Sequence, residues 1–345
     1  MDAPGATRAE SRAGRAPVSA ADRQLVALTD LLQDGQWTTG AALAANLGVS
    51  PGDVAERIDR LRQDWFVDVE QEDGRYRLRR ALERLSVPGV VAGLPARWRD
   101  GIKIGVAPCV GSTNDELIAG DAADDPQVLL AERQSRGRGR RGRAWVSPFA
   151  ANLYLSLAWG FAQQPKHITL LPLVTGVCCT RALHRCGVGE VRIKWPNDLY
   201  AEGRKLAGIL VERADARGAG CRVVIGVGVN VFMTPAQAGG VPSQWTTLEQ
   251  VAAARHMAAP SRNLLAAHLV AAIADGMVAF ARDGFDSFAA DWVSWDLTRD
   301  RRVTVLEEGR SWNGVARGID ADGALRVEAG ADVRTIHAAD VSLRL

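Results

Sequence analysis

The sequence predicts an α+β protein made of three successive folded parts. In residues 21–85, apolar side chains recur at helical spacing and are followed by two short strand-like runs. In residues 86–295, apolar runs of strand length alternate with longer amphipathic stretches, as expected for a mixed sheet covered by helices. Residues 296–345 hold short strands separated by turn dipeptides, the pattern of a small β-barrel. Residues 1–20 are expected to form a disordered tail.

Composition bounds the class of protein. With 345 residues, of which 47% are hydrophobic and 24% charged, the chain has the content of two or three ordinary globular domains. A net charge of +2 is too small for a general polyanion binder. The cysteines are odd in number, show no metal-ligand spacing and mostly lie in apolar runs: Cys109, Cys178, Cys179, Cys186 and Cys221. We therefore expect reduced thiols and a cytoplasmic protein.

Targeting signals are not expected in this chain. The first twenty residues lack the apolar core of a secretory signal. A transit peptide is disfavoured because Asp2 and Glu10 interrupt the segment and no apolar face forms. The long uncharged run from Ala144 to Pro165 alternates like a sheet segment, so we do not expect it to span a membrane.

The first folded part has the pattern of a winged helix-turn-helix. Helices are predicted at Ala21–Leu32, at Gly40–Leu47 after a Thr39 cap, and at Pro51–Asp64, where proline suits the first helical position. Two strands, Val67–Val69 and Tyr76–Leu78, are joined through Asp73-Gly74 as a wing. A small protein-interaction or regulatory module is the alternative interpretation.

Charge complicates a DNA-binding interpretation of this module. Between Ala21 and Arg80 there are eight Arg against eleven Asp or Glu, a net charge of −3, whereas a DNA reader normally carries an excess of basic side chains. A local positive face remains possible where the third helix and the wing meet. The candidate DNA contacts are Arg57, Arg60 and Arg75.

The second part begins with a linker, Leu85–Asp100, rich in Pro and Gly, and a strand at Ile102–Ala107. The stretch Gly111–Leu117 opens a helix, with Thr113 and Glu116 fitting a capping box. A strand followed by a Ser-Thr-Asn helix start also directs hydroxyls and free amides at a ligand.

The remaining elements complete the sheet, its helices and the barrel. Further strands of the sheet are predicted at Val128–Gln134, Asn152–Trp159, Val191–Trp195, Lys205–Val211 and Val223–Val231. Helices are predicted at His167–Arg185, Asn263–Arg282 and Phe285–Trp295. The barrel, of SH3-like size, is predicted from strands at Val303–Leu306, Trp312–Ile319, Ala324–Val327 and Val333–His337.

The most informative stretch is Ser135–Trp145, S-R-G-R-G-R-R-G-R-A-W, between two predicted core strands. Glycine lets backbone amides approach a ligand closely, and arginine supplies forked, permanently charged donors. A loop that combines both is suited to close around anions. Taken alone, the stretch is also compatible with a flexible basic loop or a nucleic-acid patch.

Three further motifs follow this loop: K-W-P-N-D-L-Y at Lys194–Tyr200, R-K-L-A-G-I-L-V-E at Arg204–Glu212 and G-V-G-V-N-V at Gly226–Val231. The combination resembles the biotin protein ligases, specifically their bifunctional ligase–repressor type, and the G-R-G-R-x-G-R-x-W loop is that family's signature. The resemblance extends from about Ala21 to Leu345 with the motifs in the family's order.

The resemblance implies an activity and its partners. Biotin would be activated with ATP and Mg²⁺ to biotinyl-5′-AMP and transferred to a lysine of a biotin carboxyl carrier protein. The first module would bind operator DNA and repress biotin-synthesis genes, with the adenylate promoting a homodimer. Magnesium is expected to arrive with ATP, and no protein metal site is expected.

The resemblance also implies roles for individual residues. The catalytic residues would be Lys205, Arg140 and Arg138. The biotin site would consist of Ser112, Thr113, Asn114, Gln134, Arg138, Gly139, Arg140 and Lys205. The nucleotide site would consist of Arg143, Trp145, Lys194, Asn197, Asp198, Asn230 and Trp245.

Residue chemistry alone leaves alternatives open. Lys205 at a strand start is also compatible with a solvated edge charge. Close approach of the backbone to a ligand is expected at Gly226, Gly228 and Asn230, with sheet packing at a bulge as the alternative. The five histidines fall in no catalytic or metal arrangement. Three rival functions remain: a lipoate or octanoate ligase, a transcription factor that keeps the catalytic part as a biotin sensor, and a ligase whose first module has lost DNA binding.

Overall fold

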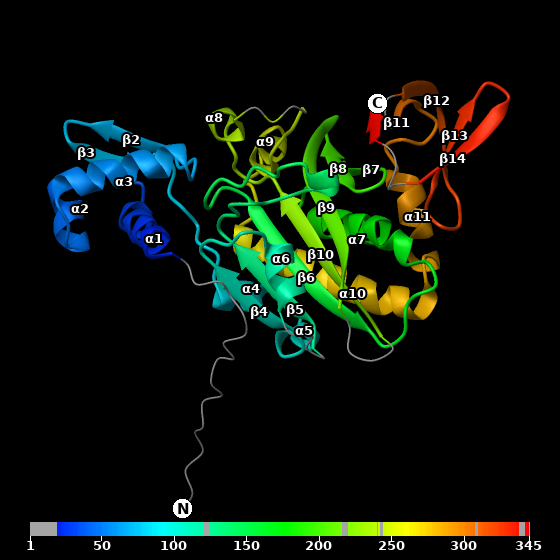
Figure 1. The fold of residues 1–345 in the computed structure, drawn as a ribbon, viewed down its shortest axis with the longest axis horizontal. Helices are drawn as coiled ribbons and strands as arrows, with labels where there is room; N and C mark the ends of the chain where they lie inside the picture. Colours follow the sequence, from blue (N-terminus) through cyan, green and yellow to red (C-terminus); the bar gives the residue numbers. More distant parts are fainter. Residues whose placement is uncertain are drawn as a thin grey trace, which may run out of the picture.

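The computed structural model describes residues 19–120, 125–215, 220–239, 241, 244–307, 310–337 and 342–344. Within these ranges the chain forms a three-stranded, a seven-stranded and a five-stranded sheet, in sequence order (Figure 1). Residues 1–18 of the expected tail lie outside the described residues, and helix α1 already begins at Ala20.

The N-terminal module, described here as residues 19–85, contains the three predicted helices. They are α1 (Ala20–Leu32), α2 (Gly40–Leu47) and α3 (Pro51–Gln63). Each helix is capped by a hydroxyl side chain that accepts a hydrogen bond from a backbone N–H of the first turn. The caps are Ser19, Thr39 and Ser50. The predicted starts of all three helices agree with the observed starts to within one residue.

The module's sheet has the order β1-β3-β2, with β1 at Thr38–Thr39, β2 at Val69–Glu72 and β3 at Arg75–Leu78. The hairpin turn at Asp73-Gly74 was predicted, but β2 begins two residues later than expected. The reason is that the Val67 N–H bonds to the Leu61 carbonyl at 2.9 Å and closes the end of α3, so it is not paired in the hairpin.

The central sheet is mixed, as predicted, with the order β4-β5-β6-β10-β9-β8-β7. Its strands are β4 (Lys103–Ala107), β5 (Gln127–Ala131), β6 (Leu153–Phe161), β7 (Arg192–Lys194), β8 (Asp198–Ala201), β9 (Arg204–Ala214) and β10 (Cys221–Val229). Only the β4–β5 pair is parallel among the pairs described. Strand β8 was not predicted, because the sequence signal stops at the turn that precedes Asp198.

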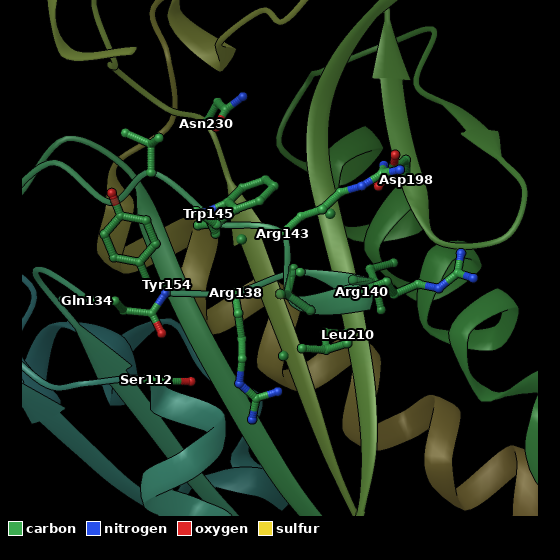
Figure 2. Close-up of a pocket in the computed structure, with 18 of the residues that line it drawn as sticks. Ser112, Gln134, Arg138, Arg140, Arg143, Trp145, Tyr154, Asp198, Leu210 and Asn230 are labelled. Atoms are coloured by element: carbon green, nitrogen blue, oxygen red, sulfur yellow. The ribbon is translucent and has the colours of Figure 1, made fainter. Parts of the chain in front are cut away.

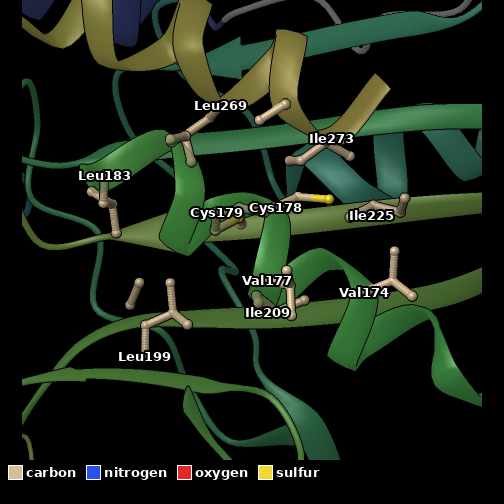
Figure 3. Packing of buried hydrophobic residues seen from close by; sticks show 14 of the residues in the cluster. Val174, Val177, Cys178, Cys179, Leu183, Leu199, Ile209, Ile225, Leu269 and Ile273 are labelled. Carbon is tan, nitrogen blue, oxygen red and sulfur yellow. The ribbon is translucent and has the colours of Figure 1, made fainter. Parts of the chain in front are cut away.

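The main core lies between this sheet and two long helices, α7 (Leu171–Arg185) and α10 (Arg262–Asp283). Figure 3 shows Val177 and Cys178 of α7 between sheet residues and Leu269 and Ile273 of α10. Helix α7 follows a short 3₁₀ turn, Ile168–Leu170, and α11 (Asp286–Trp295) covers its flank.

Alternation along β10 separates the two faces of the sheet. The odd-numbered residues from Val223 to Val229 belong to the core beneath α7 and α10. Val224 instead joins a smaller cluster with Leu117 of α6 (Thr113–Ala119), on the opposite face. Gly226 and Gly228 follow on that opposite face, which the site occupies.

Helix α10 is the single described helix that is long and apolar enough to cross a membrane. Of its apolar window, 67% is buried inside the structure. Packing against α7, α4 and β6 accounts for this composition, as in the core helices of globular domains.

The predicted linker Leu85–Asp100 is wrong, because this segment contains α4 (Val87–Gly93) and α5 (Ala96–Arg99). Ser86 caps α4, Val90 is fully buried, and the helix packs against α10. The proline and glycine content predicts a linker because both residues disfavour helices, but Pro88 lies in the first turn of α4, where proline is tolerated. Two further short helices, α8 (Pro235–Ala238) and α9 (Leu248–Ala253), were also not predicted.

The C-terminal sheet is antiparallel, with the order β14-β13-β12-β11-β15. Its strands are β11 (Arg302–Glu307), β12 (Arg310–Ile319), β13 (Leu325–Ala329), β14 (Asp332–Ile336) and β15 (Ser342–Arg344), of which β15 was not predicted. The β12–β13 turn contacts the central domain, where the Trp195 indole donates to the Gly323 carbonyl at 2.9 Å.

The N-terminal module contacts both ends of the arginine-rich loop. Phe149, which follows the loop, belongs to the module's apolar cluster and lies 4.8 Å from the Trp65 ring. Arg133, which precedes the loop, donates to the Asp64 carbonyl at 2.9 Å. Figure 1 shows the module beside the central sheet, joined to it on this side. The loop is therefore anchored on a surface that two parts of the chain share.

Candidate functional site

A cavity of about 600 Å³ lies on the face of the central sheet opposite α7 and α10. It is lined by the start of α6, the arginine-rich loop, β6, the turn before β8, β9, the end of β10 and the segment around Trp245. Figure 2 shows Ser112 and Gln134 on one side of the cavity and Arg140 and Asp198 on the other.

The cavity brings together nearly every residue that the sequence analysis singled out. Among the predicted residues it is lined by Ser112, Thr113, Asn114, Gln134, Arg138, Gly139, Arg140, Arg143, Trp145, Asn197, Asp198, Lys205, Gly226, Gly228, Asn230 and Trp245. Lys194 does not line it. Its ammonium instead lies over the Tyr200 ring, 5.2 Å from the ring centroid, and burial lowers its pKa.

The start of α6 forms the uncharged end of the cavity. The predicted capping box of Thr113 and Glu116 is wrong, because Ser112 is the cap and accepts from the Asp115 N–H. Thr113 is thereby turned toward Gln134, whose amide oxygen accepts from the Thr113 backbone at 2.9 Å and from its hydroxyl at 3.1 Å. This end presents neutral hydrogen-bonding groups.

Asn114 is held from both sides of its carboxamide. Its nitrogen donates to Glu212 Oε2 at 2.8 Å and to the Leu210 carbonyl at 3.3 Å, and its oxygen accepts from the Ser156 hydroxyl at 2.5 Å. A side chain at Gly226 would collide with the Asn114 carboxamide, so this glycine makes room for a protein side chain.

Backbone bonds tie the two sides of the arginine-rich loop together, and residues of the loop line the cavity. The Gly139 N–H donates to the Arg143 carbonyl at 2.7 Å, and the Trp145 N–H to the Gly137 carbonyl at 2.8 Å. Arg141 has a φ of 59°, in the left-handed region. The Arg138 guanidinium lies between the carboxylates of Asp115 and Glu212, the latter at 2.6 Å, and the hydrogen bonds that it donates to both raise its pKa.

The other end of the cavity carries positive charge. Arg140 donates to the Asn197 amide oxygen at 3.3 Å, and burial lowers the pKa of its guanidinium. Lys205 lies 2.7 Å from Asp198, and each of these two side chains is 23% exposed. The alternative in which Lys205 is a solvated charge at the edge of a strand is therefore wrong.

Trp145 lies on two glycines that face each other across the sheet. Gly228 of β10 pairs with Gly208 of β9, and a Cβ on Gly228 would come within 2.6 Å of the Trp145 ring. The indole N–H is buried and has no partner among the described residues. Its ring lies 5.4 Å from Lys205 Nζ. Gly228 thus admits an indole, where the sequence analysis expected backbone approach to a ligand.

Asn230 and Trp245 close the cavity near Lys205. The Lys205 N–H donates to the Gln244 carbonyl at 3.0 Å, which fixes the Trp245 segment alongside β9. The Asn230 amide donates to the Thr246 carbonyl at 3.2 Å. Residues 244–246 are thereby hydrogen-bonded to Lys205 of β9 and to Asn230, which directly follows β10.

Some lining residues were missed by the sequence analysis: Tyr154, Leu155, Gly208, Leu210 and Met233. Glu212, which contacts the lining residues Asn114 and Arg138, was quoted only within a motif. A two-residue alternation from Gly208 through Leu210 to Glu212 is the signal that places all three on the site face of β9.

The candidate DNA contacts lie in the N-terminal module. Arg57 and Arg60 are on α3, and Arg75 is on β3, 5.7 Å from the Trp37 ring centroid. Arg60 is 3.7 Å from Asp64, and the neighbouring wing residue Arg77 is 2.6 Å from Glu70. Acidic side chains therefore offset part of the module's positive charge.

The remaining reactive groups do not form a second site. All five cysteines are free, and burial raises the pKa of Cys178 to about 12 and of Cys186 to about 11. Among the described residues, no three His, Cys, Asp or Glu side chains gather as metal ligands.

The cavity combines a neutral polar end at Ser112, Thr113 and Gln134 with a cationic end at Arg140 and Lys205. This arrangement suits a ligand with an uncharged polar head and an anionic tail.

Comparison with known proteins identifies the family. Residues 106–230 match the biotin/lipoate A/B protein ligase family, and residues 299–344 match the biotin protein ligase C-terminal domain. The chain is 36% identical over 325 residues to the bifunctional ligase/repressor BirA of Escherichia coli, covering 92% of this chain and 96% of that protein. It is 34% identical to the biotin–[acetyl-CoA-carboxylase] ligase of Mycobacterium tuberculosis, over 77% and 97% of the two chains.

A solved structure agrees with these sequence matches. The biotin protein ligase of Aquifex aeolicus in complex with biotin and ATP is 25% identical, covers 70% of this chain and 98% of its own, and has a TM-score of 0.60. The BirA match, at 325 residues, reaches well beyond the two family-model regions and into the N-terminal module. The chain belongs to the biotin protein ligases, and its relatives include the bifunctional ligase/repressors.

Proposed function

We propose that this protein activates biotin with ATP to biotinyl-5′-AMP, releasing pyrophosphate, and transfers the biotinyl group to a lysine of a biotin carboxyl carrier protein, releasing AMP. The observation that carries this proposal is the polarity of the cavity, neutral at Ser112, Thr113 and Gln134 and cationic at Arg140 and Lys205. Biotin has a neutral ureido head and a carboxylate tail, which match the two ends.

The first step joins two anions, the biotin carboxylate and the α-phosphate of ATP. Fixed positive charge and backbone donors at the meeting point lower the barrier for such a step. Lys205 and Arg140 supply this charge in our proposal, and the amides of the loop near Gly139 hold the carboxylate. Closure of the loop excludes water, which would otherwise hydrolyse the mixed anhydride.

The nucleotide would occupy the end of the cavity around Arg143, Asn230 and Trp245. The planar rings of Trp145 and Trp245 suit contact with adenine, and Arg143 suits contact with phosphate. Lys194 is proposed to act at longer range, since it does not line the cavity. Asn197 and Asp198 offer hard oxygen ligands on the cavity wall, which fits Mg²⁺ bound together with ATP.

Transfer of labelled biotin to a purified biotin carboxyl carrier domain tests this function. Transfer is expected with ATP and Mg²⁺, and not without ATP. Lipoate and octanoate offered at equal concentration discriminate the rival ligase activity, and the match to the biotin protein ligase C-terminal domain favours biotin. Preferential transfer of lipoate would contradict the proposal.

We further propose that the N-terminal module is a winged helix-turn-helix that represses biotin-synthesis genes as an adenylate-promoted homodimer. The order of its helices and hairpin and the relation to bifunctional ligase/repressors support this. Its net charge of −3 gives it little non-specific attraction to DNA, so two modules on a two-fold operator would be needed.

Titration of operator DNA with apo, biotin-bound and adenylate-bound protein tests this second activity. The adenylate form is expected to bind most tightly, and Arg57→Glu is expected to abolish binding while leaving biotin transfer intact. Equal binding by all three forms would contradict a switch. Full transfer without any DNA binding would identify a ligase whose module has lost its DNA function.

The domain boundaries follow as part of the proposal. We assign residues 21–85 to the DNA-binding domain, 86–295 to the catalytic domain and 296–345 to an SH3-like barrel. The catalytic domain would act in the cytoplasm, where ATP and the carrier protein are available.

A further inference from the structure

Glu212 of β9 joins two parts of the cavity that are far apart in sequence. One carboxylate oxygen accepts from Asn114 on the cavity floor at 2.8 Å, and the other accepts from Arg138 of the loop at 2.6 Å. We propose that Glu212 is a positioning residue that couples the uncharged end of the cavity to closure of the arginine-rich loop. The consequence for biotin rests on the function proposed above.

On the floor, Glu212 completes the hydrogen bonds of Asn114. Both donors of the Asn114 carboxamide and its oxygen are engaged by Glu212, Leu210 and Ser156. The Ser156 hydroxyl also lies 2.7 Å from the Thr113 hydroxyl, which faces Gln134. Asn114 therefore orients the groups that present hydrogen bonds to a ligand, and Glu212 fixes which way its amide faces.

On the loop, Glu212 and Asp115 hold the Arg138 guanidinium from two sides. Two carboxylates around one guanidinium leave no excess positive charge at this point. Arg138 was predicted to be catalytic, but its position suits a latch that keeps the loop closed. Neutralisation of the ligand carboxylate is then left to the other end of the cavity, where Arg140 bonds the neutral Asn197 amide and Lys205 faces one carboxylate, Asp198.

Replacing Glu212 by Gln is a specific test of this coupling. A carboxylate can accept from Asn114 and Arg138 at once, whereas an amide presents one oxygen and one NH₂. In Glu212→Gln the NH₂ must face a donor on one side, so at least one of the two contacts is lost. The size and shape of the side chain stay the same.

Limited trypsin cleavage of the loop in the ligand-free protein measures closure, because the loop offers arginine sites. Glu212→Gln is expected to be cleaved there about tenfold faster, the factor that corresponds to about 1.4 kcal/mol. The KM for biotin is expected to rise by a similar factor. Glu70→Gln is the matched control, since Glu70 has a comparable exposure of 25% and a comparable 2.6 Å partner, Arg77, outside the cavity.

Asp115→Asn separates the effect on the loop, through Arg138, from the effect on the uncharged end of the cavity, through Asn114. Asp115 contacts Arg138 through its side chain and has no side-chain bond to Asn114 among the described contacts. This variant is expected to accelerate loop cleavage with a smaller rise in the KM for biotin than Glu212→Gln. In a double-mutant cycle, Asp115→Asn and Arg138→Gln should not increase the rate of cleavage at the remaining arginines additively, because each change removes the same contact between Asp115 and Arg138.

The cleavage assay needs no ligand, so it distinguishes failure of this inference from failure of the proposed function. Cleavage and biotin KM of Glu212→Gln equal to those of the unmutated protein would overturn the role of Glu212. If Asp115→Asn and Glu212→Gln changed loop cleavage and the KM for biotin identically, the proposed role of the bond between Glu212 and Asn114 would be overturned. If Glu212→Gln loses its cooperative thermal unfolding, Glu212→Asp, which keeps the charge on a shorter chain, is compared by the same criteria.

Discussion

Lys205 Nζ lies 2.7 Å from Asp198 Oδ1, on neighbouring strands of the central sheet. The pairing holds a lysine at the cavity wall that its sequence position alone would leave in solvent. Both side chains are about three-quarters covered, so the charge is fixed before any ligand enters. A preorganised cation of this kind stabilises developing negative charge without reorganisation during the reaction.

Lys205→Gln is expected to slow adenylate formation by about 10²–10³-fold, the usual effect of removing one electrostatic contact to a transition state. Single-turnover formation of biotinyl-adenylate is the measurement. Lys103→Gln is the matched control, because Lys103 also starts a strand and is paired with an aspartate, Asp125, at 3.0 Å. Adenylation at the unmutated rate in Lys205→Gln would remove this lysine from the mechanism.

Gly228→Ala is expected to displace Trp145 and weaken ATP binding. The added Cβ would come within 2.6 Å of the indole, which rests on Gly228 and Gly208. Gly160→Ala, on β6, is the control, since a Cβ there meets no atom within 4 Å. Tryptophan fluorescence and the KM for ATP measure the two effects. Unchanged values for both would show that the glycine pair is not needed to seat the ring.

Glu132→Ala is expected to lower the free energy of unfolding by about 3–5 kcal/mol, because it leaves a buried charge unpaired. Glu132 is 1% exposed and lies 2.6 Å from Arg262, whose side chain is 0% exposed. It also accepts from the Leu85 N–H at 2.7 Å and pairs with Arg84 of the N-terminal module. Denaturant unfolding is the measurement. Asp291→Ala, which breaks a pair with Arg181 in which both side chains are about one-third exposed, should lower the free energy of unfolding much less.

Asp296→Asn is expected to stabilise the protein at neutral pH and not at acidic pH. Burial raises the pKa of Asp296 above its ordinary value of 3.8, and one carboxylate oxygen has no partner among the described residues. A raised folded-state pKa means that the stability contributed by the protonated form is present below 3.8 and is lost as pH rises through the folded pKa.

Thermal melting of Asp296→Asn and the unmutated protein from pH 4 to pH 8 measures this effect. The variant should melt a few degrees higher at pH 8, and the difference should shrink toward pH 4. Thr298, which donates to the other carboxylate oxygen, can keep its bond to the amide oxygen. A difference independent of pH would mean that ionisation of Asp296 does not limit stability.

Local signals in the sequence were sufficient for elements whose chemistry is contained within a few residues. The cap at Thr39, the helix start at Pro51 and the turn at Asp73-Gly74 are such cases, because a cap, a helix start or a turn is decided by neighbours in the chain. The linker prediction over Leu85–Asp100 failed because α4 depends on its packing against α10, nearly two hundred residues later. Tertiary contacts override local propensity in short segments.

The sequence by itself determined the family and, apart from Lys194, residues that line the cavity, since its motifs stand in the order found in the biotin protein ligases. Only the tertiary structure decided what each side chain contacts. It pairs Lys205 with Asp198, encloses Arg138 between Asp115 and Glu212, and seats Trp145 on Gly208 and Gly228. These partners come from the loop, from helix α6 and from different strands, and the tertiary fold brings them into contact at separations along the chain that no local pattern encodes.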